Sequence, residues 1–332
     1  MMSKSGGISI IIIVVIILVA LVAFYLLTSL LLKIKAFGSL KFRPIQTQTP
    51  ELIKKKAFIT SDGYELRWYG EVKPDDEIII LGVHDFALGG KSFDQLAKAL
   101  SNVDLKVSLI SFDQRNFGQN KTQDPKNRNS VAVLSDLEQI LNYCKTTYPD
   151  KRLYLYGGGF GANIIVTFMK KRGYLVAGIV LDSMINFKPD KNSATTTTAL
   201  IKGTLFAYTQ MVKINLNPAD YHVPVKNAQG LGQNLNSFSE MTVREYFQNK
   251  KMVSTSLKAA SLITKPVLML NGSDDVFQLS TRTTKFYDQI SYPQKHHQWF
   301  AEKKHDLFLN PNQEMLQNLI EWLKNNEQEK SD

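Results

Sequence analysis

Residue types that could carry acyl-transfer chemistry occur in order along the chain from residue 153 onward. Residues 153–156 read as a strand that leads into Gly-Gly-Gly-Phe-Gly-Ala at residues 157–162, followed by an apolar helical pattern. An acid, Asp275, and a histidine, His305, each follow a later strand-like segment. A carboxylate that orients a histidine, which in turn activates a nucleophile, is the arrangement of triad catalysis. Asp275 and His305 therefore predict two members of a triad.

The third member is missing where it is expected. The frame G-x-S-x-G places a serine on a tight turn between a strand and a helix, and here Gly159 stands at the serine position between Gly157 and Gly161. Glycine has no side chain, so no acyl-enzyme can form there. Because the turn is strained, glycine also fits its backbone easily. Losing the serine costs the fold little and removes the chemistry.

Two upstream segments complete the set of motifs. Val-His-Asp-Phe at residues 83–86 ends a predicted strand, and Asp-Gln-Arg-Asn-Phe-Gly at residues 113–118 follows the next. In this order, the five motifs make residues 57–326 resemble the monoacylglycerol lipase and lysophospholipase group of α/β hydrolases, also described as serine aminopeptidase-like. The resemblance implies an eight-stranded sheet, a helical cap and acyl-ester substrates, often lipids. It also implies that the backbone amides of Phe86 and Phe160 form the oxyanion hole.

The departures from the family pattern are as informative as the matches. Asp85 replaces a glycine of the oxyanion loop, and a carboxylate facing the site would repel the negative charge that an oxyanion hole stabilises. Asn116 replaces another glycine, and asparagine tolerates a positive φ better than most residues. We expect the Asn116 change to be structural and the Asp85 change to be functional.

The rest of the chain supplies the alternating elements of such a fold. Asp-Gly in the turn at residues 61–63 predicts a hairpin of 57–60 with 64–70. Apolar strands alternate with helical patterns, which predicts a mostly parallel sheet covered by helices on both faces. The interval 184–262 has no clean strand and is interpreted as a cap insertion. The predicted strands are 77–83, 107–112, 152–156, 176–181, 266–271 and 295–300; the predicted helices are 93–100, 131–148, 161–172, 281–290 and 313–326.

An apolar segment precedes this domain. Residues 8–32 are 25 consecutive positions without a charge, long enough to span a bilayer with some tilt. We therefore predict a single-pass transmembrane anchor at 1–35, a basic polar tether at 36–56 and the hydrolase domain at 57–328. The basic residues that follow the span place the domain on the cytoplasmic side by the positive-inside rule and suit anionic lipid headgroups. They are Lys33, Lys35, Lys41, Arg43, Lys54, Lys55 and Lys56.

Other classes of function fit the sequence less well. The net charge of +10 comes without any nucleic-acid-binding motif. The histidines lack metal-ligand spacing, so no metal and no cofactor are predicted. Residues 157–162 also match the dinucleotide fingerprint G-x-G-x-x-A, with Asp182 at the place of a ribose-binding acid, but about 100 residues of sheet precede them. Ser183 lies after the wrong strand to replace the nucleophile.

The sequence thus predicts a membrane-anchored pseudohydrolase that binds a lipid-like acyl ligand or a protein partner. The alternative is an ester or lipid hydrolase in which His305 activates a water molecule lying in the space left by the serine. A dinucleotide-binding protein is the alternative of another class. Whether the chain is an enzyme is left open by the sequence.

Overall fold

The computed structural model describes residues 4–38, 47–86, 88–122, 130–186, 211–213, 220 and 240–326. Most of the predicted cap insertion lies outside these residues. The sequence also offers Leu205, Phe206, Ile214 and Leu216 as lining for an apolar pocket in that cap, and these four lie outside the described residues.

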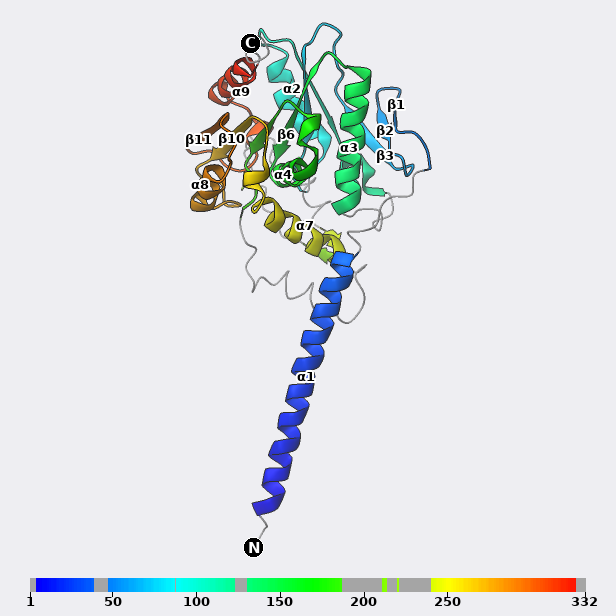
Figure 1. Cartoon of the computed structure of the whole chain (residues 1–332), viewed down its shortest axis with the longest axis vertical. Coiled ribbons are helices and arrows are strands. Elements are labelled where there is room, and N and C mark those ends of the chain that lie inside the picture. Colours follow the sequence, from blue (N-terminus) through cyan, green and yellow to red (C-terminus); the bar gives the residue numbers. More distant parts are fainter. Residues whose placement is uncertain are drawn as a thin grey trace.

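One nine-stranded sheet organises the described domain (Figure 1), with the order β1-β2-β3-β5-β4-β6-β7-β10-β11. The strands from β5 to β11 pair in parallel, whereas β1, β2 and β3 form an antiparallel meander at one edge. The strands are β1 Glu51–Ile53, β2 Ala57–Ile59, β3 Glu65–Tyr69, β4 Ile78–Val83, β5 Val107–Phe112, β6 Arg152–Gly158, β7 Gly178–Asp182, β10 Val267–Gly272 and β11 Lys295–Phe300.

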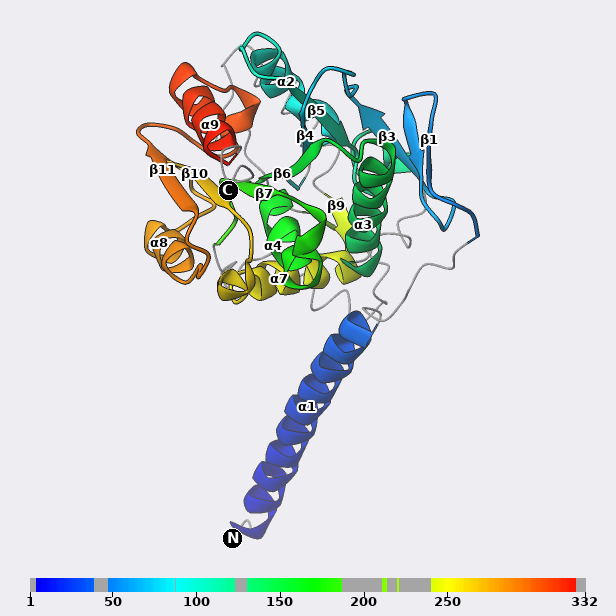
Figure 2. The ribbon, with the colours of Figure 1, turned by 45° about the horizontal axis from the view of Figure 1, so that its top comes forward.

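Helices cover both faces of this sheet (Figure 2), as the continuous apolar strands predict. Alternate side chains of one strand enter two different cores: Ile79 and Leu81 of β4 pack in one, Ile78 and Ile80 in the other. The first core includes α3 Ser130–Thr147, α4 Phe160–Arg172, α7 Val243–Ser256 and α8 Ser280–Asp288. The second includes α2 Asp94–Leu100 and α9 Gln313–Asn325.

The predicted α/β-hydrolase architecture is confirmed, with one added strand. Residues 51–53 fall in the segment predicted as a tether, yet they form β1, which pairs with β2 and makes the sheet nine-stranded rather than eight-stranded. Lys54 and Lys55, predicted to flank the membrane, adopt positive φ in the tight turn between these strands. The ordered domain therefore begins before residue 57.

The cap interval also contains elements that the sequence did not predict. Met211–Lys213 (β8) and Glu240–Thr242 (β9) form a small antiparallel pair, and α7 follows directly. Thr242 and Glu245 make a reciprocal capping box at the start of α7. The Thr-x-x-Glu spacing was a readable signal for this helix start.

An N-terminal helix, α1 Lys4–Gly38, projects away from the domain (Figure 1). Its apolar stretch Ile10–Thr28 is long enough to cross a membrane, and none of it is buried against the rest of the described chain. Length and composition fit a membrane span and equally fit an N-terminal signal sequence.

Candidate active site

The candidate site lies at the carboxyl ends of the parallel strands, the edge where open α/β sheets bind their ligands. Gly159 connects β6 to α4 with φ 47° and ψ −115°, a backbone conformation that favours glycine. A Cβ on Gly161 would overlap the carbonyl of Val83, so glycine is needed there for the close approach of α4 to β4. The strand, turn and helix predicted around residues 157–162 are thus present.

The structure brings the two predicted triad residues together. His305 Nδ1 lies 2.7 Å from Asp275 Oδ2, and both side chains are buried. Asp275 follows β10 and is itself oriented by the amide of Phe277, which donates to Oδ1 at 2.8 Å. The Phe277 ring packs on the His305 ring with centroids 4.5 Å apart. The acid and the histidine therefore have a fixed mutual geometry.

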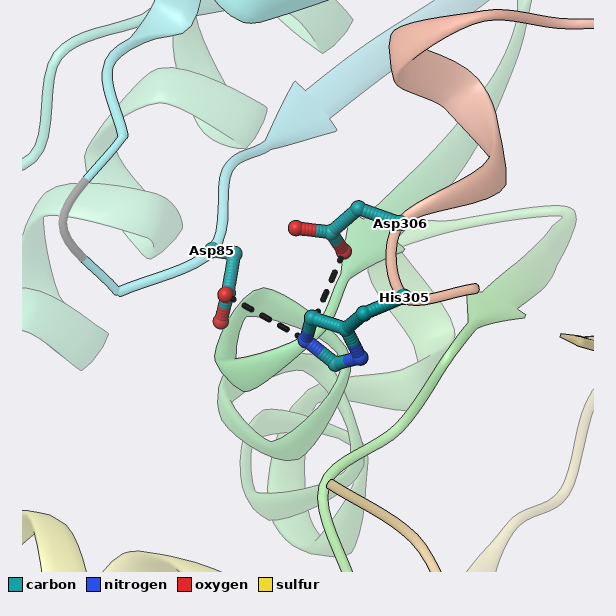
Figure 3. Close-up of side chains that lie close together, drawn as sticks. All are labelled: Asp85, His305 and Asp306. Atoms are coloured by element: carbon teal, nitrogen blue, oxygen red, sulfur yellow. Dashed lines mark ion pairs between the residues drawn. The ribbon is translucent and has the colours of Figure 1, made fainter. Parts of the chain in front are cut away.

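Asp85 fills the space of the missing serine side chain. A Cβ built on Gly159 would lie 2.8 Å from Asp85 Oδ2 and closer still to its Cγ and Oδ1. Oδ1 accepts a hydrogen bond from the amide of Phe160, the predicted oxyanion donor, and Oδ2 lies 3.4 Å from His305 Nε2 (Figure 3). One carboxylate thus occupies both the nucleophile position and one half of the predicted oxyanion hole.

A hydrogen-bonded histidine fixes the loop that carries Asp85. His84 Nε2 accepts from the amide of Gln114 at 2.9 Å, so the proton is assigned to Nδ1, which donates to the carbonyl of Asp85 at 2.7 Å. The Gln114 side chain returns a bond from Nε2 to the His84 carbonyl at 2.7 Å. The sequence placed both residues in motif segments, 83–86 and 113–118, but did not predict this contact, because it joins the loops after two different strands.

A second acid beside His305 was also not predicted from the sequence. Asp306 is fully buried in a left-handed conformation (φ 58°), and its Oδ1 lies 3.9 Å from His305 Nε2. Neither of its carboxylate oxygens has a hydrogen-bond partner among the described residues. Burial raises the pKa of Asp306 well above its usual range, and the nearby Asp85, Asp182 and Asp275 carboxylates raise it further.

The charge state of His305 follows from its neighbours. Burial by itself would lower its pKa, but the nearby carboxylates, Asp275 first among them, outweigh this and hold the pKa well above the usual value for histidine. Both ring nitrogens of His305 face a carboxylate: Nδ1 faces Asp275 and Nε2 faces Asp85. In a serine triad, by contrast, Nε2 faces the nucleophile hydroxyl.

The residues of the dinucleotide alternative have structural roles instead. Asp182 is fully buried and accepts from Tyr156 Oη at 2.8 Å and from the amide of Phe308 at 2.9 Å. Its pKa is raised to about 6, chiefly by burial. Ser183 Oγ donates to Asp182 at 2.8 Å and accepts from the amide of Asp306 at 3.0 Å. These groups hold the loop after β11 against the end of β7, so Asp182 does not face outward as a ribose-binding acid must.

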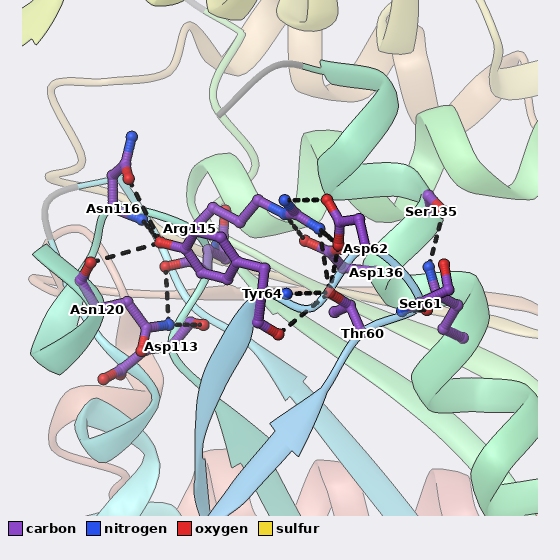
Figure 4. Close-up of polar contacts among 12 residues, drawn as sticks. Thr60, Ser61, Asp62, Tyr64, Asp113, Arg115, Asn116, Asn120, Ser135 and Asp136 are labelled. Carbon is purple, nitrogen blue, oxygen red and sulfur yellow. Dashed lines mark hydrogen bonds and ion pairs between the residues drawn. The ribbon is translucent and has the colours of Figure 1, made fainter. Parts of the chain in front are cut away.

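The loop after β5 is held by a buried ion network (Figure 4). Arg115 donates from Nε to Asp136 and from Nη1 to Asp62, each at 2.7 Å. This ties the hairpin turn between β2 and β3 to α3. Asn116 adopts φ 63° beside Arg115, so the replacement of glycine is accommodated by the asparagine backbone as expected.

The second predicted oxyanion donor is the backbone amide of Phe86. The ring of Phe86 packs edge-on against that of Phe117, with centroids 5.4 Å apart. The contribution of the Phe86 amide to an oxyanion hole stays a prediction.

The order of the strands, the turn between β6 and α4, and the place of the loops that carry Asp275 and His305 are those of an α/β-hydrolase fold. The family model "Serine aminopeptidase, S33" matches residues 74–312, so the chain belongs to this family. It is also 23% identical over 286 residues, 79% of this chain and 71% of the relative, to a protein of Schizosaccharomyces pombe whose name marks it as a candidate monoglyceride lipase.

Solved structures share the fold. A monoacylglycerol lipase of Paleococcus ferrophilus superposes with a TM-score of 0.67 at 16% identity, over 79% of this chain and 99% of the other. A soluble variant of the Saccharomyces cerevisiae monoglyceride lipase, solved with a substrate analogue, gives a TM-score of 0.67 at 18% identity, over 86% and 98% of the two chains. These likenesses show that the chain has the α/β-hydrolase fold of both lipases.

Proposed function

We propose that this protein is a pseudohydrolase with respect to serine chemistry, tethered to a membrane by α1. The observation that carries the proposal is the place of Asp85. Its carboxylate lies where the side chain of a serine at position 159 would begin, and it accepts the Phe160 amide. An oxyanion that develops in this site would meet a fixed negative charge in place of a free donor.

The same contact argues against the alternative of a water molecule activated by His305. Such a water must lie within hydrogen-bond reach of Nε2, which acts as its base, and beside the carbonyl carbon that it attacks. The carboxylate of Asp85 lies 3.4 Å from Nε2 and takes up the space left by the serine. A role in binding an acyl ligand or a protein partner agrees with a site that keeps the fold without the nucleophile.

The unmodified protein should not react with a fluorophosphonate probe and should not hydrolyse short-chain esters above background. An active monoglyceride lipase in the same detergent serves as the positive control. Ester hydrolysis that is lost in His305→Ala would contradict the pseudohydrolase proposal and support the water mechanism. Hydrolysis that persists in His305→Ala would point to a contaminating enzyme.

The full-length protein should stay with membranes after washing with high salt and with alkali. The uncharged surface of Ile10–Thr28 has no protein partner in the described chain, and lipid would cover it. A chain that starts at residue 47 should be soluble, because Thr47 already hydrogen-bonds the Ser61 carbonyl and β1 is retained. Release of an N-terminally shortened protein from cells would instead indicate a cleaved signal sequence. Protease protection of the domain tests the cytoplasmic orientation.

A further inference from the structure

The site holds a set of donor atoms that neither serine chemistry nor its loss requires. Asp85, His305 and Asp306 are all buried, and each offers one ligand atom within 4.8 Å of the others (Figure 3). The donors come from the loops after two strands, so their spacing in sequence does not resemble a metal motif. The prediction of no metal site rested on that spacing alone.

The distances suit a metal ion. His305 Nε2 is 3.4 Å from Asp85 Oδ2 and 3.9 Å from Asp306 Oδ1. Bonds of about 2.0–2.2 Å to an ion with tetrahedral geometry separate neighbouring ligand atoms by roughly 3.4 Å. The Asp85–His305 pair is already at this separation, and the Asp306 carboxylate would have to move closer to His305 to reach it.

Asp306 supplies the independent sign of a missing partner. Its carboxylate is fully buried, points toward His305 (Figure 3), and has no hydrogen-bond partner on either oxygen among the described residues. A buried polar group without a partner is costly and calls for a specific explanation. A bound cation would satisfy both its charge and its lone pairs.

The local charge points the same way. Within the described part of the chain, the ion pairs of Asp85, Asp275 and Asp306 all involve the single His305. Three ionised carboxylates on one imidazole would leave an excess of negative charge in a buried volume, which is unfavourable without a cation. A divalent cation between Asp85 and Asp306 would balance these two charges and leave His305 to pair with Asp275.

The surrounding groups are those of a metal site. A ligating histidine usually donates its other ring nitrogen to a carboxylate, which fixes its orientation, and Asp275 accepts from Nδ1 at 2.7 Å. The Phe160 amide holds Asp85 Oδ1, which leaves Oδ2 on the side of His305. Asp85 and His305 would therefore be oriented before an ion arrives, whereas the Asp306 carboxylate would gain its partner from the ion.

We propose that Asp85, His305 and Asp306 bind one divalent transition-metal ion, with Asp275 as the positioning residue behind His305. One imidazole and two carboxylates suit Zn²⁺, Co²⁺ or Mn²⁺ better than Mg²⁺ or Ca²⁺, which prefer oxygen ligands alone. The inference goes beyond the proposed function, because it concerns ion binding and requires no turnover.

The test is a metal titration of the full-length protein in detergent, purified with a tag that contains no histidine and freed of metal by a chelator. Zn²⁺ affinity is measured by competition with a chromogenic chelator. Co²⁺ is added separately, and its visible absorption reports the ligand geometry. One equivalent should bind, and saturating Zn²⁺ should raise the melting temperature.

Asp306→Asn and Asp85→Asn should each weaken Zn²⁺ binding at least tenfold, and Asp275→Asn should weaken it by roughly 10–100-fold. Asparagine tolerates the left-handed conformation of residue 306, so the first variant should fold. Asp274→Asn is the matched control, because this exposed acid beside Asp275 lies outside the cluster. Its affinity should equal that of the unmodified protein.

No stoichiometric binding of Zn²⁺, Co²⁺ or Mn²⁺ would overturn the proposal, and so would binding that survives both Asp85→Asn and Asp306→Asn. If one variant fails to unfold cooperatively, the other decides. The titration uses no ester and no probe, so its outcome is separate from that of the labelling test above. A protein that binds Zn²⁺ and also reacts with fluorophosphonate would retain this inference while losing the pseudohydrolase proposal.

Discussion

Gly159→Ser by itself should remain unreactive toward a fluorophosphonate probe, whereas Gly159→Ser combined with Asp85→Gly should be labelled. The new serine Cβ would overlap the Asp85 carboxylate in the single variant. Removing that carboxylate frees both the Phe160 amide and the space between residue 159 and His305. Asp275 and His305 are already paired and need only a hydroxyl to act on.

The expected contrast is large because triad members act as a unit. In subtilisin, loss of the nucleophile alone costs about 10⁶-fold in turnover. The double variant should therefore move from background to clear labelling even if its geometry is imperfect. A side chain at the positive φ of residue 159 adds strain of about 1–3 kcal/mol, so both serine variants should melt at lower temperature than the unmodified protein.

Two matched variants make this result specific. Gly159→Ala with Asp85→Gly has the same steric change without a hydroxyl and should stay unlabelled. Adding His305→Ala to the labelled double variant should abolish its reaction. Strong labelling of Gly159→Ser with Asp85 intact would show that Asp85 moves aside easily, contrary to its role as the group that fills the serine position.

Arg115→Met should destabilise the domain by about 3–5 kcal/mol, the cost of leaving buried carboxylates without their partner. The Arg115 side chain is 1% exposed and is paired with both Asp62 and Asp136. Denaturant unfolding of the chain that starts at residue 47 measures the change. The surface pair of Lys106 with Glu77 is the control, and Lys106→Met should leave the unfolding midpoint unchanged. An equal effect of the two substitutions would contradict the structural role of Arg115.

The same variant should change how stability depends on pH. Burial acts to raise the pKa of Asp62, but hydrogen bonds from Arg115 and Thr60 outweigh it, so the folded-state pKa is below the usual value. A lowered folded pKa contributes stability above the unfolded pKa of about 3.9, and this contribution is lost as the pH falls through the folded pKa. The free energy of unfolding of the unmodified protein should therefore fall as the pH is lowered below about 4. Arg115→Met should remove the part of this fall that comes from Asp62.

Much of the fold could be predicted because its signals are local. Continuous apolar runs predicted the central strands. Helical patterns between them predicted that these strands pair in parallel, as they do in the structure. Asp-Gly at residues 62–63 marked the hairpin of β2 and β3. The strand β1 was missed because Pro44, Pro50 and the neighbouring Gln and Thr residues indicated a polar tether. Its stability comes from pairing with β2 rather than from its own sequence.

By itself, the sequence also determined that Gly159 has no nucleophile and that Asp275 and His305 lie after the strands that should bring them together. Only the tertiary structure decided what replaces the serine. The Asp85 loop and the turn at Gly159 lie about 75 residues apart in sequence, and no local pattern states where a carboxylate will point. Whether Asp85 repels a substrate from a distance or fills the serine position depends on the approach of β4 to β6 and on the bonds that His84 makes. The same holds for Asp306, whose burial beside His305 is set by packing against the end of β7.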